Sequence, residues 1–344
     1  MDGNKNKRDA KFVLITRKSR LAELVVRYNT VQQARFYIER LGADFGDYMQ
    51  EDQDYKVALA SVQQQLAELG RVQLVNRAYV PNFIFGPEDI VVVLGQDGLV
   101  ANTMKYLSGQ PLVAVNPDPL RWDGVLLPFL VHDVKAVVRD VLQGYRSSRE
   151  VTLAQATLND GQIIYAVNDL FIGRRTHVSA RYLLQLEGRQ ETQSSSGVIV
   201  STGLGSTGWL SSVMTGASRV AEQVTGQRMS WTSDQLRQSE RQPVKEERQT
   251  EQPIAQNRGM DMNRYSRWSL PELFFTVREP FVSRTTGGEL ACGCIEQGQQ
   301  LRITSQMPEQ GVIFSDGMEE DYLEFNAGVE AIISRADKAG SLVV

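Results

Sequence analysis

The stretch Ile90–Gly98, IVVVLGQDG, decides the fold of this chain. Its first part is an uninterrupted apolar run rich in valine, which is typical of a strand buried on both faces of a sheet. The turn Gly95–Gly98 follows directly, and the helix-like segment Val100–Leu107 comes next. A strand that leads through a glycine-containing turn into a helix is the beginning of a βαβ unit. We therefore expect a parallel sheet that helices cover on both faces.

The same alternation of strand-like and helix-like patterns surrounds this stretch. Apolar runs predict further strands at Phe12–Thr16 and Leu112–Val115, and helical spacing predicts helices near Thr30–Leu41, Tyr55–Leu69 and Asp133–Leu142. From Arg149 onward, short strands joined by turns predominate, and one helix, Ser206–Val224, interrupts them. The strands are predicted at Val151–Leu158, Gln162–Val167, Arg181–Leu186, Gly197–Ser201, Leu273–Val277, Leu290–Ile295, Gln300–Ser305, Gly311–Ser315 and Val329–Ser334.

These patterns predict two domains. Residues 1–146 form an N-terminal, Rossmann-like α/β domain, and residues 147–344 form a C-terminal domain of the all-β type. A polar segment rich in Gln, Arg and Glu, residues 227–268, interrupts the second domain. Because this segment has few aliphatic residues, we expect a mobile surface insertion. A lid or a segment that docks a partner is the alternative.

Composition excludes several classes of protein. The chain has 344 residues, two cysteines, two histidines and a formal net charge of −4. The few cysteines and histidines exclude a multi-cysteine zinc site, an iron–sulfur framework and a disulfide scaffold, and we expect no protein metal site. The negative charge argues against binding to nucleic acid or to anionic membranes. Since neither a membrane-spanning run nor a signal peptide is evident, we expect a soluble, cytoplasmic protein.

The turn Gly95–Gly98, which follows the predicted strand Ile90–Leu94, contains a carboxylate between two glycines. Gly95 and Gly98 let the backbone approach a phosphate, and the following helix N-terminus adds unpaired N–H groups. Asp97 would repel a phosphate unless a cation or a reacting hydroxyl lies nearby, which suits a general base. The alternative is a structural turn in which Asp97 caps the helix.

Two later segments also place polar atoms at strand ends, where open α/β sheets bind ligands. Asn168 and Asp169 offer an amide and a carboxylate that could bind two hydroxyls of a sugar, although an ordinary turn is the alternative. Ser201–Trp209, STGLGSTGW, follows an apolar strand and could hold phosphate or sugar oxygens. It contains G-x-G-x-x-G, but the acid-bearing strand of a dinucleotide fold is missing. Without G-x-x-x-x-G-K-[ST] a P-loop is excluded, and the pair Cys292 and Cys294 is interpreted as structural.

Together, these motifs resemble those of the NAD kinase family, within the wider superfamily of diacylglycerol and sphingosine kinases. Gly95–Leu99 is similar to the family's GGDGT motif, and Asn168–Asp169 is similar to its NE/D motif. Ser201–Trp209 is similar to the segment TPTGSTAY, and Val312–Gly317 resembles the Asp-Gly strand near the family's C-terminus. The resemblance covers most of the chain from about Ile90, apart from the insertion, and is strongest to a divergent bacterial branch.

The resemblance implies an active site between the two domains. It implies magnesium-dependent transfer of the ATP γ-phosphate to the 2′-hydroxyl of the adenosine ribose of NAD. Asp97 would be the catalytic base, and the phosphates would be bound by Gly95, Gln96, Gly98, Gly205 and Ser206. The acceptor would be bound by Asn168, Asp169, Thr207, Gly208, Trp209 and Ser212. The partners would be ATP and NAD, and the chain would form a dimer or tetramer.

The sequence departs from the family's motifs at several positions. Gln96 replaces the second glycine of GGDGT, and a positive φ at this position would strain a glutamine. Leu99 and Leu204 replace hydroxyl-bearing residues, and Ser196 stands where many NAD kinases have an aspartate.

These differences leave other functions open. One is a kinase of the same architecture that phosphorylates a sugar or a lipid. Another is a nucleotide-binding protein without catalysis, for which Gln96 is the motivating residue. A Rossmann oxidoreductase is the last alternative.

Overall fold

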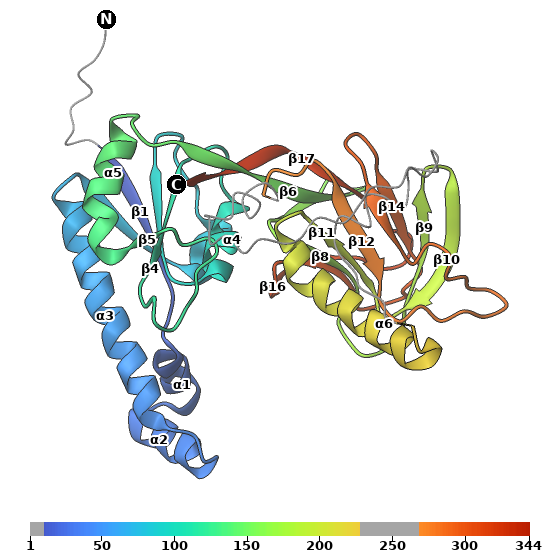
Figure 1. Ribbon diagram of the computed structural model, residues 1–344, viewed down its shortest axis with the longest axis horizontal. Coiled ribbons are helices and arrows are strands. Elements are labelled where there is room, and N and C mark those ends of the chain that lie inside the picture. Colours follow the sequence, from blue (N-terminus) through green and yellow to red (C-terminus); the bar gives the residue numbers. More distant parts are fainter. Residues whose placement is uncertain (1–9, 228–267) are drawn as a thin grey trace, which may run out of the picture. The chain divides into compact units, whose positions relative to one another are not determined.

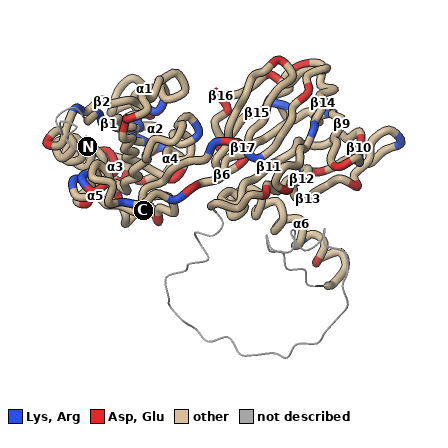
Figure 2. The backbone as a smooth tube through the Cα atoms, turned by 90° about the horizontal axis from the view of Figure 1, so that it is seen from above, with Lys and Arg blue, Asp and Glu red and all other residues tan. Residues whose placement is uncertain are grey.

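The computed structural model describes residues 10–227 and 268–344 (Figure 1). The predicted insertion 227–268 therefore lies outside the described residues, except for its first and last residue. Within the described part, the chain divides into two compact units. Unit 1 contains the chain up to Glu150 together with Ala339–Val344, and unit 2 is Val151–Lys338. Acidic and basic residues are interspersed along the strands and helices of both units (Figure 2).

Unit 1 is built on a parallel sheet. Its central strands pair in the order β4, β3, β1, β2, and both the short strand β5 and Leu342 near the chain's end pair with β4. All these pairings are parallel, as the buried apolar runs predict. The bounds are β1 (Lys11–Thr16), β2 (Arg71–Asn76), β3 (Ile90–Leu94), β4 (Leu112–Asn116) and β5 (Phe129–Leu130).

Two helices pack together against this sheet and form its core. The apolar faces of α3 (Phe45–Ala67) and α5 (Val134–Leu142) cover buried strand residues such as Leu14 and Val92 (Figure 1). The other helical elements of unit 1 are α1 (Arg20–Tyr28), α2 (Val31–Arg40), α4 (Asp97–Met104) and the 3₁₀ turns η2 (Arg77–Asn82) and η3 (Val131–Asp133).

Unit 2 is a sandwich of two sheets over one core. The six-stranded sheet runs β13, β12, β11, β8, β15, β16, with every neighbouring pair antiparallel. The other sheet contains β10, β9, β14 and β17, with β6 and β7 paired beside them. The common core includes Leu170, Val200 and Phe275 from the first sheet and Leu184 and Ile303 from the second.

The strands of unit 2 and its helix have the following bounds: β6 (Ser148–Leu158), β7 (Ile163–Ala166), β8 (Asp169–Arg174), β9 (Ala180–Leu186), β10 (Arg189–Ser195), β11 (Val198–Ser201), η4 (Gly205–Thr207), α6 (Trp209–Thr225), β12 (Leu273–Val277), β13 (Cys292–Ile295), β14 (Leu301–Ser305), β15 (Gly311–Ser315), β16 (Met318–Glu324) and β17 (Glu330–Val343). Strand alternation turns Phe171 and Phe274 to the outer face of the six-stranded sheet, where α6 packs on them. The predicted combination of an α/β domain and a β-rich domain is confirmed.

Candidate functional site

The turn between β3 and α4 in unit 1 has an unstrained backbone. Gln96 precedes the helix with φ −113°, so the strain expected for a positive φ does not arise. Gly95 is buried, and a Cβ there would lie 2.7 Å from Cδ2 of Leu99. Gly98 is exposed in the first turn of α4, with open space where a Cβ would stand. The turn therefore leaves room for a ligand beside Gly98.

Asp97 joins this turn to the loop that follows β4. Its Oδ2 accepts a hydrogen bond from the N–H of Val125 at 3.0 Å, and its Oδ1 accepts one from Leu126 at 2.7 Å. Gly124 makes this arrangement possible because its φ is +64° and a Cβ would lie 2.9 Å from Leu127 Cβ. Asp97 is the first residue of α4, and Gln96 is the N-cap of this helix. The two backbone donors fix the orientation of the Asp97 carboxylate.

In unit 2, Asp316 fixes the backbone around Asn168 and Asp169. The carboxylate of Asp316 accepts hydrogen bonds from the N–H groups of Val167, Asn168 and Asp169 at 3.0, 2.6 and 3.2 Å. Asp316 itself has φ +52°, in the left-handed region that aspartate adopts more readily than most residues. The sequence Ser315-Asp316-Gly317 thus forms a turn whose side chain anchors a segment distant in the chain.

The glycine-rich loop after β11 packs against the same segment. The Thr202 hydroxyl donates to the carbonyl of Val167 at 2.6 Å and accepts from the N–H of Gly205 at 3.1 Å. A Cβ on Gly205 would lie only 2.2 Å from the carbonyl oxygen of Asn168, so only glycine fits. Ser206 is buried, and its hydroxyl donates within the loop to Gly203 at 2.8 Å.

The structure thus brings Asn168, Asp169, Gly205 and Ser206 together in unit 2. The predicted phosphate-binding residues Gly95, Gln96 and Gly98, with Asp97, form a separate group in unit 1. Thr207 and Gly208 are exposed just before α6, and the Ser212 hydroxyl donates to the carbonyl of Gly208 at 3.2 Å.

Asp169 has an unusual electrostatic environment. Its Oδ1 is buried without a hydrogen-bond partner. Burial, together with the negative charge of Asp316, raises the pKa of Asp169 to about 7, although a hydrogen bond with the Ser201 side chain acts in the opposite direction. An aspartate that titrates near neutral pH within a cluster of polar residues is typical of functional sites.

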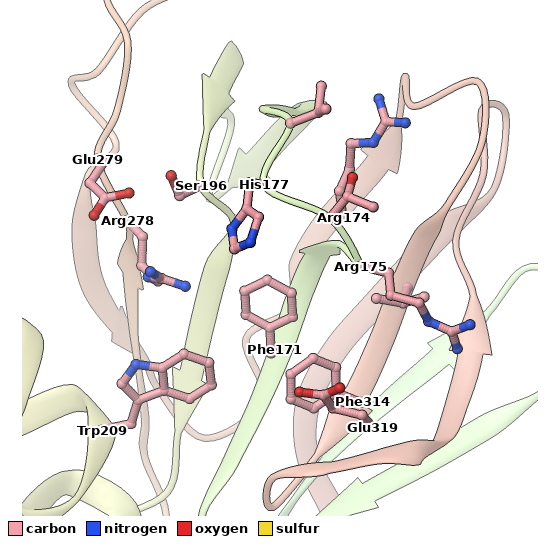
Figure 3. A pocket seen from close by; sticks show the side chains of 13 residues that line it. Phe171, Arg174, Arg175, His177, Ser196, Trp209, Arg278, Glu279, Phe314 and Glu319 are labelled. Atoms are coloured by element: carbon pink, nitrogen blue, oxygen red, sulfur yellow. The ribbon is translucent and has the colours of Figure 1, made fainter.

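A cavity of about 330 Å³ lies on the outer face of the six-stranded sheet. Its aromatic wall is formed by Phe171 of β8, Trp209 of α6 and Phe314 of β15, with Phe171 in the middle (Figure 3). The Phe171 ring stacks on those of Trp209 and Phe314, with centroids 5.7 and 4.8 Å away. Flat apolar surface of this kind suits a planar ring.

Cationic groups surround this aromatic wall. Arg278 lies over the Trp209 ring at 5.5 Å, and Arg175 lies over Tyr322 at 4.0 Å. Arg174 and His177 line the cavity on the side of β8, together with the acidic side chains of Glu279 and Glu319 elsewhere on its rim (Figure 3). Arginines beside stacked rings are suited to a ligand that combines an aromatic ring with phosphate.

Of the predicted site residues, Trp209 lines this cavity. The sequence motifs did not predict Phe171, Phe314 and Arg278 as site residues. A signal was present for Phe171, which follows Asn168–Asp169 at an outward-facing strand position. Phe314 stands two residues before Asp316, but Arg278 gave no signal because it follows β12 without a motif.

Residues 10–227 and 268–344 contain neither a cluster of metal-ligating side chains nor a membrane-spanning helix. No group of three or more His, Cys, Asp and Glu side chains there is placed to hold a metal ion. None of the helices described is both long enough and apolar enough to cross a membrane.

Comparison with known proteins gives a match in structure and none in sequence. No family model and no curated protein matches the sequence. The structure of yeast NADH kinase complexed with NADH superposes with a TM-score of 0.52 at 14% identity, covering 98% of this chain and 84% of that one. An NAD kinase from Archaeoglobus fulgidus in complex with ATP gives a TM-score of 0.51 at 13% identity, covering 97% and 93%. The chain has the NAD kinase fold.

The NAD kinase resemblance predicted from the motifs is thereby confirmed at the level of the fold. In this NAD kinase fold, the GGDGT-like turn belongs to unit 1, and the NE/D-like and TPTGSTAY-like segments belong to unit 2. The Asp-Gly strand, β15 with its turn, anchors the NE/D-like segment through Asp316.

Proposed function

We propose that this protein is an ATP-dependent NAD kinase, a phosphotransferase that converts NAD to NADP. The observation that carries the proposal is the junction between the NE/D-like and TPTGSTAY-like segments, in a chain that has the NAD kinase fold over nearly its whole length. Gly205 packs directly on the Asn168 carbonyl, and Asp316 holds the backbone on either side of Asn168. This close packing supports a precise binding surface for the acceptor.

In the proposed reaction, the 2′-hydroxyl oxygen of the adenosine ribose attacks the γ-phosphorus of ATP. The bond from this phosphorus to the β,γ-bridging oxygen breaks, ADP leaves, and Asp97 accepts the hydroxyl proton. Gly95, Gln96 and Gly98 bind the phosphates of ATP through the turn. Gly205 and Ser206 contribute by fixing the glycine-rich loop, because their N–H groups and the Ser206 hydroxyl already donate within it. Phosphoryl transfer depends chiefly on such positioning and on neutralising the charge that develops.

The acceptor is bound by unit 2 in this proposal. Asn168 and Asp169 hold its ribose, and Thr207, Gly208 and Ser212 contribute polar groups at the start of α6. Trp209 provides the aromatic wall on which a ring of the dinucleotide stacks, with Arg278 beside it.

Magnesium enters this proposal as part of the substrate, the MgATP complex. Mg²⁺ often keeps several waters and binds mainly through the phosphates of its nucleotide. We also propose that the protein is cytoplasmic and forms a dimer or tetramer, which light scattering of the purified protein can test.

The test is NADP formation by purified protein supplied with ATP, magnesium and NAD, measured with an NADP-specific dehydrogenase. The Asp97→Asn variant prepared in parallel reports contaminating kinase. NADP production well above that background supports the proposal. If NADP is not formed while a sugar or a lipid is phosphorylated, the acceptor assignment is wrong. Binding of ATP and NAD without any turnover would instead indicate a nucleotide-binding protein.

A further inference from the structure

Two neighbouring carboxyl groups of unit 2, Asp169 and Asp316, have opposite surroundings. Asp316 accepts three backbone hydrogen bonds, from consecutive residues that end at Asp169, at 2.6 to 3.2 Å. Hydrogen bonds of this kind stabilise the ionised form of a carboxyl group. Asp316 is therefore the member of the pair that carries the negative charge.

Asp169 has no comparable support. Its Oδ1 is buried and makes no hydrogen bond. The carboxyl group has one side-chain hydrogen bond, with Ser201, and this bond lowers the pKa of Asp169 less than burial raises it. The elements packed on β8 here are β11, which presents Ser201 opposite Asp169, and the turn after β15, which presents Asp316. The charge that acts on Asp169 is that of Asp316, and it is repulsive.

Two adjacent carboxyl groups in a partly buried site do not readily ionise together. The proton goes to the group whose charge is less well stabilised, which is Asp169. A neutral carboxyl group can leave its carbonyl oxygen unpaired at a far smaller energetic cost than an anion can. The unpaired Oδ1 is thus explained if Asp169 is protonated, and the pKa of about 7 agrees with this.

We infer that Asp169 binds the acceptor as a neutral acid, donating a hydrogen bond to an acceptor oxygen, while Asp316 remains the anion that fixes the loop. This inference rests on the proposed function, which supplies NAD as the acceptor. It reverses the role expected for a carboxylate beside ribose, which would accept hydrogen bonds from hydroxyl groups. The neutral form also avoids repulsion between the side chain and the diphosphate of the dinucleotide.

The first experiment measures the affinity for NAD by calorimetry at pH 6 and pH 8.5. With a pKa near 7, the neutral form falls from nearly all of the protein to a few per cent, so wild-type affinity should fall roughly 30-fold. Asp169→Asn keeps a hydrogen-bond donor and cannot ionise, so its affinity should match the wild type at pH 6 and change less than about twofold at pH 8.5. Asp169→Ala should bind weakly at both pH values.

The matched control is Asp160→Asn, on the exposed turn after β6, which should behave like the wild type. Wild-type affinity that does not change with pH would overturn the inference. Loss of binding in Asp169→Asn at pH 6 would also overturn it, since an anion would then be required.

A second experiment does not depend on NAD. Carboxyl ¹³C resonances of labelled aspartate are titrated in the free wild-type protein and in Asp169→Asn. We expect one resonance with a midpoint near pH 7 that is missing from the variant. A midpoint below about pH 5 for the missing resonance would place the charge on Asp169 and refute the inference. If the wild type binds no NAD at either pH, the proposed function fails, whereas this titration still decides the location of the proton.

Discussion

Replacing Gly205 by alanine tests the junction at the centre of the candidate site. The added Cβ would lie 2.2 Å from the Asn168 carbonyl oxygen and 2.6 Å from its carbonyl carbon. Since ordinary contact begins at 3.4 Å, one of the two segments has to move by about 1 Å. The atoms that would have to yield are backbone atoms, and the Asn168 carbonyl also accepts the N–H of Thr202 at 2.9 Å. Overpacking costs about 1–3 kcal/mol and a lost hydrogen bond about 1 kcal/mol, so we expect a loss of about 2–4 kcal/mol.

Urea-induced unfolding followed by fluorescence measures this loss, and NAD affinity measured on the folded variant should fall as well. The matched control is Gly216→Ala in the middle of α6, where a Cβ meets nothing within 4 Å. That control should unfold at the wild-type urea concentration or slightly above it, because alanine favours a helix by up to about 1 kcal/mol. If Gly205→Ala unfolds together with this control, the close packing of the two segments is refuted.

Three further predictions concern single residues of the site. Asp97→Asn should lose about 100-fold or more in kcat, and a near-normal kcat would refute its role as base. Its unfolding midpoint should fall slightly, because the amide can accept only one of the two backbone hydrogen bonds that the carboxylate accepts. The difference in unfolding free energy between Asp169→Asn and the wild type should increase as the pH rises from about 3.8 to about 7. Over this range the native wild type has to lose a proton that it binds more tightly than the unfolded chain does, so the wild type alone is destabilised. The limit is about 4 kcal/mol, and an equal pH dependence in both proteins would contradict the raised pKa. Trp209→Ala should raise the KM for NAD at least tenfold while leaving the KM for ATP unchanged, and equal changes in both would exclude stacking of the acceptor.

The sequence predicted the elements whose signal is local. The valine-rich strand β3 and the strands β12 and β15 were placed at their observed bounds, because continuous apolar runs reflect burial on both faces. Helix α3 was predicted only from Tyr55, whereas it begins at Phe45 with Asp44 as its N-cap. Strand β10, RQETQSS, was missed because its pairing with β9 stabilises a sequence that has no apolar pattern.

The site residues could likewise be predicted where their signal lies in a short, local motif. The glycine-rich loop and the Asn-Asp pair are short motifs, and the structure packs them together as Gly205 requires. The partner of Asp169 was not foreseen, since Asp316 is 147 residues away in the chain and acts through backbone hydrogen bonds. The cavity was missed for a similar reason, because Phe171, Trp209 and Phe314 come from three elements that meet only in the folded sheet.

The last residues of the chain have a consequence for the order in which this protein folds. Leu342 and Val343 are almost completely buried in unit 1, although all of unit 2 precedes them in the sequence. Domains generally fold in turn as they leave the ribosome, the N-terminal one first. Here the part that is synthesised first is completed last, because β4 obtains its pairing with Leu342 only after residues 151–338 have been made. Until then the nascent chain carries an unfinished sheet edge, which is a site where chaperones would be expected to act.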